Sequence, residues 1–190
     1  GRTLAFQARY VGSIPITRSI FLPRSAILMK GTKTMIDSYV ALDIETTGLN
    51  PAADRIIEIG MARVCNGNVA DTYSTLVNPG IKISDRIIEL THIHNEELTD
   101  KPRINELIDD VIQFIGDYPI LGHNVIFDYS FLKKAAVNNN LVFPSAGIDT
   151  LKMARRILPE LEHKKLDYLC EYLKIDPCLL YTSPSPRDGL

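Results

Sequence analysis

The segment Tyr39-Val-Ala-Leu-Asp-Ile-Glu45 is the most informative part of this chain. Every second residue of the run 40–44 is a branched aliphatic, which is typical of a strand with one face in the core. Asp43 and Glu45 then share the opposite face, and the intervening Ile44 is directed into the core. The pattern therefore predicts a strand that carries two carboxylates side by side near its end.

The regions that follow this strand predict a mixed α/β domain. Residues 55–64 and 69–77 are apolar and β-rich, and Asn66-Gly67 between them is a strong signal for a two-residue hairpin. A three-stranded antiparallel start is the expected result. Apolar residues then recur at three- and four-residue intervals over residues 104–115, and Gly116 follows, which indicates an amphipathic helix.

Shorter elements are predicted in the second half of the chain. Residues 118–121 are a strand candidate, and Gly122-His-Asn124 is expected to open a helix that runs toward residues 138–140. A further short strand is expected to end near Asp149. The last predicted elements are two helices, at residues 150–158 and 165–173.

Two adjacent carboxylates favour a bound cation, because like charges held close raise each other's pKa unless a cation neutralises them. Hard divalent cations such as Mg²⁺ or Mn²⁺ prefer oxygen ligands of this kind. A lone Asp-x-Glu, however, is more often a solvated strand edge followed by an ordinary Thr-Gly turn than a metal site. Asp128 is a third candidate, in the first turns of the helix that carries Phe127 and Phe131. An acid near a helix N-terminus also stabilises the helix by roughly 0.3–1 kcal/mol, so Asp128 has a structural alternative too.

Two motifs together resemble a known family. Asp43-Ile-Glu-Thr-Thr-Gly48 and Gly122-His-Asn-Val-Ile-Phe-Asp-Tyr-Ser-Phe-Leu132 are similar to the first two motifs of the DnaQ-like (DEDD) 3′→5′ exonucleases. The resemblance is closest to bacterial proofreading exonuclease domains of the DNA polymerase III epsilon type, and it covers residues 35–177. It implies a ribonuclease H-like mixed sheet flanked by helices, with three antiparallel strands followed by parallel ones. It also implies a reaction with two divalent metal ions, Mg²⁺ or Mn²⁺, in which an activated water cleaves the terminal phosphodiester.

The resemblance also implies roles for individual residues. The residues that would hold the metals and carry the reaction are Asp43, Glu45 and Asp128. Those that would lie near the terminal nucleotide are Ile44, Thr46, His123, Asn124 and Phe127. For Phe127 a place in the core is as good an interpretation as base stacking, and Asn124 is equally credible as a helix cap.

The third motif of this family, a His-x₄-Asp that supplies a general base and a fourth metal ligand, is expected after residues 166–175. The segment 178–188 instead reads like one translation frame of a sequencing adapter. His163 and Asp167 offer a His-x₃-Asp substitute, but the resemblance places them at the approach to the Leu-rich helix of residues 166–175, ahead of the position of the third motif. We therefore expect a domain that is truncated before its last motif and impaired in activity. In the same comparison, His92 and His94 belong to a loop beside the substrate cleft, with structural packing as the equal alternative.

Composition limits the organisation of the chain. Its 190 residues suffice for one globular domain, and residues 35–177 carry 14 basic and 22 acidic side chains, which is not the footprint of a simple nucleic-acid binder. Residues 1–34 hold six basic and no acidic residues, and we expect them to be upstream translation and disordered, with a targeting peptide as the alternative. Residues 178–190 are expected to be an adapter-derived tail. The three cysteines lack metal-site spacing and no membrane span is evident, so a reducing cytoplasm fits best.

The sequence thus predicts a metal-dependent 3′→5′ exonuclease that removes nucleoside monophosphates from single-stranded 3′ ends of DNA, with a DNA polymerase III subunit as a partner. An exoribonuclease of the same superfamily would share every residue named above. A non-catalytic module that grips a nucleic-acid end or a polymerase is the alternative from a different class.

Overall fold

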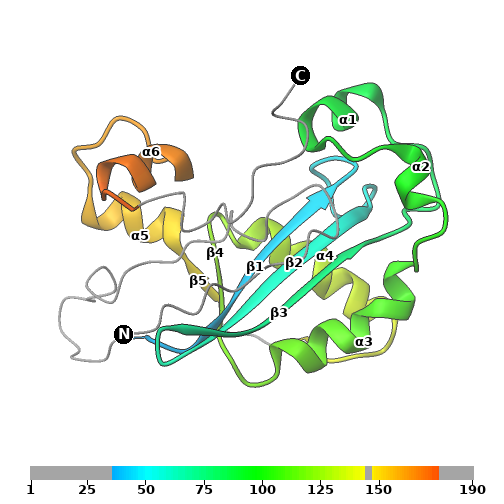
Figure 1. Cartoon of the computed structure of the whole chain (residues 1–190), viewed down its shortest axis with the longest axis horizontal. Helices are drawn as coiled ribbons and strands as arrows, with labels where there is room; N and C mark the ends of the chain where they lie inside the picture. Colours follow the sequence, from blue (N-terminus) through cyan, green and yellow to red (C-terminus); the bar gives the residue numbers. More distant parts are fainter. Residues whose placement is uncertain (1–35, 144–146, 176–190) are drawn as a thin grey trace, which may run out of the picture.

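The computed structural model describes residues 36–143 and 147–175, and they form a mixed sheet flanked by helices (Figure 1). Within these ranges the sheet has five strands in the order β3-β2-β1-β4-β5. The strands are β1 (Tyr39–Thr46), β2 (Ile56–Cys65), β3 (Asn68–Leu76), β4 (Ile120–Gly122) and β5 (Gly147–Asp149). The predicted α/β class, with antiparallel strands first and parallel strands later, is confirmed.

The central strand β1 pairs in two ways. It is antiparallel to β2, which is in turn antiparallel to β3, and it is parallel to β4, which is parallel to β5. Asn66 and Gly67 close the β2–β3 hairpin with φ angles of 52° and 74°. Both angles lie in the left-handed region that a tight hairpin of this kind requires, and this is why Asn-Gly predicted it.

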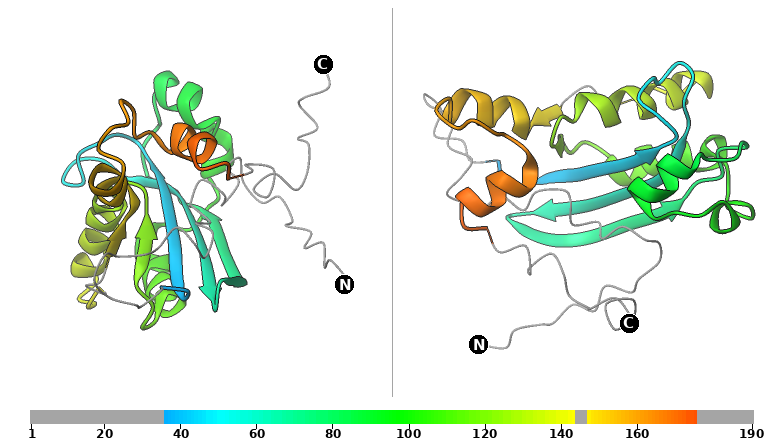
Figure 2. Two further views of the ribbon diagram at one scale, coloured as in Figure 1. Left: turned by 90° about the vertical axis from the view of Figure 1, so that its left-hand side faces the viewer. Right: turned by 90° about the horizontal axis from the view of Figure 1, so that it is seen from above.

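Helices cover both faces of β1 (Figure 2). The helices of the described residues are α1 (Asp85–Thr91), α2 (Asn95–Leu98), α3 (Ile104–Ile115), α4 (Ile126–Asn138), α5 (Thr150–Ile157) and α6 (Leu166–Tyr172). Alternation along β1 sends Leu42 and Ile44 into the main core with α3 and α4, where Leu132 is fully buried. Ala41 faces the other way, into a smaller cluster against which Leu166 of α6 packs.

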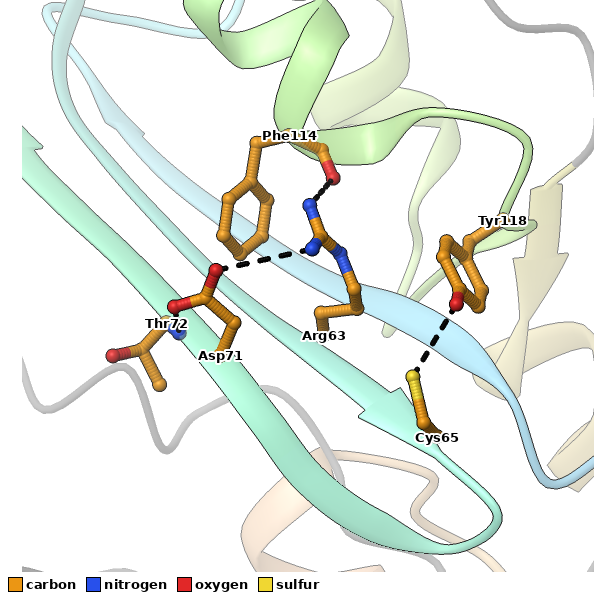
Figure 3. Close-up of polar contacts among 6 residues, drawn as sticks. All are labelled: Arg63, Cys65, Asp71, Thr72, Phe114 and Tyr118. Atoms are coloured by element: carbon orange, nitrogen blue, oxygen red, sulfur yellow. Dashed lines mark hydrogen bonds and ion pairs between the residues drawn. The ribbon is translucent and has the colours of Figure 1, made fainter.

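An arginine joins the hairpin to the C-terminal end of α3 (Figure 3). The Arg63 guanidinium lies 4.5 Å from the Phe114 ring centroid and donates to the Phe114 carbonyl oxygen at 2.6 Å. Beside it, the Cys65 thiol donates to the Tyr118 hydroxyl at 3.4 Å. Because a helix end leaves carbonyls without intrahelical partners, Arg63 satisfies one of them while it fixes α3 on the sheet.

Two local features differ from the sequence prediction. The helices α1 and α2 were not predicted, because they have only 7 and 4 residues and hence little periodicity. The helix α4 begins at Ile126 rather than at Gly122, since Gly122 completes β4 and Asn124 has a φ of 63° that no α-helix contains. A side chain at Gly122 would also approach the Leu42 carbonyl oxygen to 3.0 Å.

The expectations for the two ends of the chain, residues 1–34 and 178–190, lie outside the described residues. Within the described ranges, no helix is both long enough and apolar enough to cross a membrane.

Candidate active site

The end of β1 and the first turn of α4 meet through Asp128. Its carboxylate Oδ1 accepts a hydrogen bond of 3.0 Å from the backbone N–H of Ile44, a residue 84 positions away in sequence. The Asp128 side chain is buried, with 5% exposed. This contact carries the third candidate carboxylate to the strand that holds Asp43 and Glu45.

The pKa of Asp128 is raised to about 8. Burial is the largest cause, and the negative charges of Asp43 and, more weakly, Glu45 add to it, whereas the hydrogen bond from Ile44 acts in the opposite direction. The three predicted carboxylates are therefore close enough to interact electrostatically. Without a cation, Asp128 holds a proton at neutral pH.

Glu58 of β2 belongs to the same electrostatic group, and the sequence analysis did not assign it a role. It lies opposite Glu45 in the β1–β2 register, with 3% of its surface exposed. Its Oε2 atom has no hydrogen-bond partner among the described residues. Burial, followed by the charges of Glu45 and Asp43, raises its pKa to about 8. The available signal was the acid itself, which interrupts the apolar run 56–59. Burial of a carboxyl group in a core strand destabilises the fold, so its presence there indicates a function.

These four acids provide a set of oxygen donors suited to hard divalent cations. In the described part of the chain, no three Asp, Glu, His or Cys side chains are arranged to hold one metal ion between them. Mg²⁺ does not require such a cage, because it usually retains several waters and binds through one or two carboxylates plus substrate phosphates. The donor set therefore fits a cation of this kind that is bound by these carboxylates and, in addition, by phosphate oxygens of a substrate.

The turn that follows β1 is held by its own polar groups. The buried Thr46 hydroxyl donates to the Gly48 carbonyl oxygen at 2.6 Å. The Asp54 carboxylate accepts from the Asn50 backbone N–H at 2.8 Å and from the Thr47 hydroxyl at 3.3 Å. A Cβ at Gly48 would lie 2.5 Å from this carboxylate, so a larger residue there would displace the Asp54 side chain.

Lys134 of α4 fastens the same turn to the helix. Its ammonium group donates to the carbonyl oxygens of Pro51 and Ala52 at 2.6 and 2.8 Å. Leu49 lies within the turn and is 84% exposed. The residues after Glu45 are thus fixed relative to α4, although one of their apolar side chains faces solvent.

His123 connects β4 to the C-terminal helices. Its Nδ1 lies 3.1 Å from the Thr150 hydroxyl, and its ring also has a hydrogen bond with the backbone of Lys164. Burial is the largest influence on its pKa and lowers it, and the positive charge of Arg155 acts in the same direction. The half-buried His123 therefore lies where α4, α5 and the segment before α6 meet.

The proposed cap role of Asn124 is wrong. The N-cap of α4 is Val125, and Asn124 precedes it in a left-handed conformation with an exposed side chain. Its backbone N–H donates to the Asp149 carboxylate at 3.1 Å. Phe127 is partly buried against the main core, with its ring centroid 5.0 Å from that of Phe131, so packing is one of its roles.

The remaining histidines are exposed. The His163 side chain is 62% exposed, with its Nε2 4.0 Å from a Glu162 carboxylate oxygen. It precedes α6, so helical spacing does not place it on one face with Asp167. His92 and His94 lie at the junction of α1 and α2, as the C-cap of the first helix and the N-cap of the second.

The comparisons with known proteins agree with this geometry. The family model of the RNase_T exonucleases matches residues 40–178. The chain belongs to this exonuclease family. A DNA polymerase III of PolC type from Clostridium perfringens is 35% identical over 139 residues, which are 73% of this chain and 10% of the relative. The corresponding protein of Caldanaerobacter subterraneus is 38% identical over 137 residues, 72% of this chain and 10% of the relative. The chain thus spans about a tenth of the length of these curated relatives.

Solved structures of other exonucleases have the same fold. Exonuclease X, in complex with 5′ overhanging duplex DNA, superimposes with a TM-score of 0.58 at 26% identity, over 77% of this chain and 76% of that chain. Escherichia coli exonuclease I, in complex with an oligonucleotide, has a TM-score of 0.57 at 20% identity, over 64% of this chain and 30% of that chain. The DnaQ-like exonuclease fold expected from the two motifs is confirmed.

Proposed function

We propose that this exonuclease-family protein hydrolyses DNA from its 3′ end with the help of divalent cations and releases nucleoside monophosphates. The observation that carries the proposal is the buried contact of Asp128 with the Ile44 N–H, which gathers three carboxylates at the end of β1. Surplus negative charge that raises carboxyl pKa values is a typical property of sites that receive a cation.

In this proposal Asp43, Glu45 and Asp128 hold two ions, Mg²⁺ or Mn²⁺, together with phosphate oxygens of the substrate. When bound, the ions supply positive charge, which lowers the pKa of a bound water and offsets the negative charge on the oxygens around the phosphorus. With pKa values of about 8, Asp128 and Glu58 are protonated at neutral pH without a cation, and positive charge favours the release of these protons. Cation binding is therefore expected to be coupled to proton release.

Five further residues would position the terminal nucleotide: Ile44, Thr46, His123, Asn124 and Phe127. Their places support this assignment to different degrees. The side chain of Asn124 is exposed and Phe127 is partly exposed, so both can reach a ligand. The Thr46 hydroxyl donates within its own turn and can still accept a hydrogen bond. His123 already has partners on α5 and before α6, which favours a positioning role for it.

The PolC-type relatives are DNA polymerases III, which supports a replicative polymerase as the partner of this domain and the cytoplasm as its location. The expectation that the reaction's general base lies outside this chain stays a prediction. A sequence read of the gene beyond residue 177 tests it, and a His-x₄-Asp there is the expected finding.

The activity is tested with a single-stranded DNA oligonucleotide labelled at its 3′ end, incubated with the protein and Mn²⁺, Mg²⁺ or EDTA. Release of labelled mononucleotide only with a cation, and its loss in the Asp43→Asn variant, is the expected result. Cleavage within the strand, or release that persists in EDTA, would contradict the proposal. An RNA oligonucleotide of equal length, run in parallel, identifies an exoribonuclease if it is the better substrate.

Calorimetric titration with Mn²⁺ gives a second readout, which does not depend on turnover. We expect binding that the Asp43→Asn and Asp128→Asn variants weaken. Binding of the oligonucleotide without cation affinity and without cleavage would support the non-catalytic module instead.

A further inference from the structure

The helix α5 has one strongly basic face. Lys152, Arg155 and Arg156 are exposed, and their spacing of three and four residues places them on the same side of the helix. Thr150 and Ala154 are its buried residues, on the side toward the rest of the domain. We call the three exposed cations the α5 basic stripe.

The three cations of the α5 basic stripe have no ion-pair partner among the described residues. The helix Thr150–Ile157 contains no acidic residue, and none of the three cations has an ion pair or hydrogen bond with a described side chain. Isolated surface cations are common, but here three of them are adjacent in a domain whose residues 35–177 have a net charge of −8. Basic charge is thus concentrated on one short helix.

Helix stability accounts for only part of this arrangement. Arg155 and Arg156 lie in the last turn, where cations favourably oppose the helix dipole. Lys152 lies in the first turn, at the positive end of the dipole, where a cation is unfavourable. A role that requires positive charge along the whole helix explains all three.

The α5 basic stripe begins beside the candidate active site. The strands β1, β4 and β5 are parallel, so their C-terminal ends lie along one edge of the sheet, and α5 starts directly after β5. Asp149 at this junction accepts from the backbone N–H of Asn124 and caps α5 by accepting from Leu151. Thr150 contacts His123, whose pKa is also lowered by the charge of Arg155.

The opposite side of the molecule has the opposite charge. The helices α1 and α2 lie across the sheet from α5 (Figure 1). Residues 85–98 contain four acids and one base: Asp85, Glu89, Glu96, Glu97 and Arg86. A polyanion is therefore repelled on one side of the molecule and attracted at α5.

We propose that the α5 basic stripe binds backbone phosphates of the nucleic-acid strand whose 3′ end enters the site. The inference rests on the proposed function, to which it adds a phosphate-binding surface. Contacts of this type fix the position of a strand without reading its sequence, as an exonuclease that removes every nucleotide requires.

The test is the salt dependence of binding to a single-stranded phosphorothioate oligonucleotide, which resists hydrolysis, with fluorescence anisotropy as the readout in Mg²⁺. Each phosphate contact contributes about 0.7 to the slope of log K against log salt for a single strand. The triple variant Lys152→Gln, Arg155→Gln, Arg156→Gln is therefore expected to lower the slope by about 2 and to weaken binding at low salt by about tenfold or more.

The matched control is Lys82→Gln, Arg86→Gln, Lys101→Gln. It removes the same charge from exposed positions in and around α1 and α2. We expect it to leave the slope within about 0.5 of the unmodified protein, because loss of net charge alone acts weakly at a distance. A charge-conserving variant, Lys152→Arg, Arg155→Lys, Arg156→Lys, should keep the slope, and thermal unfolding of every variant verifies that each is folded.

The inference is overturned if the α5 triple variant binds with the original slope and affinity, or if the control loses as much as the α5 variant. A loss confined to the α5 variant supports it. Failure of this inference is distinguishable from failure of the proposed function. If the α5 triple variant has a lower salt-dependence slope but the unmodified protein releases no mononucleotide from any oligonucleotide, the activity is refuted and the binding surface is retained. Release with an unchanged slope would do the reverse.

Discussion

Two regions of this molecule hold their charged groups in opposite ways. The first is the β1–α4 centre, which comprises Asp43, Glu45, Glu58 and Asp128. The second is the α5–α6 segment, residues 150–172. In the centre, Asp128 and Glu58 are 5% and 3% exposed, and burial raises both pKa values. In the α5–α6 segment Lys152, Arg155 and Arg156 are exposed, and the buried residues of α6 are Leu169 and Cys170.

The difference shows which of the charged groups lower the free energy of unfolding. A carboxyl group can be buried beside other carboxyl groups only if the surrounding core compensates for its desolvation. Exposed cations require no such compensation and can be changed without unfolding the domain. Substitutions in the centre should therefore affect activity and stability together, whereas those in the α5–α6 segment should affect at most binding.

Asp128→Asn separates charge from fold within the centre. An asparagine retains an oxygen that can accept from the Ile44 N–H, so the fold should persist. We expect mononucleotide release to fall by about 10²–10³-fold, as for loss of one strong electrostatic contact in a transition state. Asp85→Asn, an exposed acid in α1, is the control and should retain full activity. Equal activity in both variants would remove Asp128 from the site.

The core beneath the centre should matter far more to stability than the surface of α6. Leu132 is fully buried, and Leu132→Ala is expected to lower the free energy of unfolding by about 2–5 kcal/mol. Tyr172 is 48% exposed, and Tyr172→Ala should change it by no more than about 0.5 kcal/mol. Urea denaturation measures both. A loss of several kcal/mol at Tyr172 would show that α6 is part of the core.

Stability without cations should fall as the pH rises. Asp128 and Glu58 have pKa values of about 8 in the folded protein, against ordinary values of 3.8 and 4.5. Between about pH 4 and pH 8 the folded state therefore binds more protons than the unfolded state, so the contribution of these groups is present at low pH and is lost as the pH approaches 8.

This pH dependence can be measured by urea denaturation in EDTA at several pH values from 5 to 8. The double variant Asp128→Asn, Glu58→Gln should flatten the profile, and Mg²⁺ should stabilise the unmodified protein more at pH 8 than at pH 5. An unchanged profile in the double variant would show that the two acids titrate normally.

Lys134 should have a smaller effect, confined to the turn after β1. Removal of its two hydrogen bonds to Pro51 and Ala52 by Lys134→Met is expected to cost about 1–2 kcal/mol and to speed proteolysis at residues 47–54. The neighbouring Lys133, exposed and 5.6 Å from the Tyr129 ring centroid, is the control, and Lys133→Met should leave the turn protected. Equal proteolysis of the two variants would contradict the anchoring role.

His163→Ala should have the smallest effect of all. Because its exposed side chain lies beside Glu162 and Tyr168, away from the carboxylates of β1, we expect any cation-dependent release of mononucleotide to stay within about twofold. Loss of that activity would instead identify His163 and Asp167 as a functional His-x₃-Asp pair.

Local sequence patterns were sufficient for the main elements and for the family. Alternation predicted β1 and the shared face of Asp43 and Glu45, Asn66-Gly67 predicted the hairpin, and the helical period predicted α3, because each depends only on neighbouring residues. The two motifs indicated the exonuclease family.

Other features depend on contacts between distant segments. The β1–β2 register placed Glu58 opposite Glu45, and a contact over 84 residues seated Asp128 on the Ile44 N–H. The late start of α4 and the link from His123 to α5 likewise follow from close packing of β4 against its neighbours. Burial and register are properties of the packed chain, and they raise the pKa values of Asp128 and Glu58 beside the acidic motif.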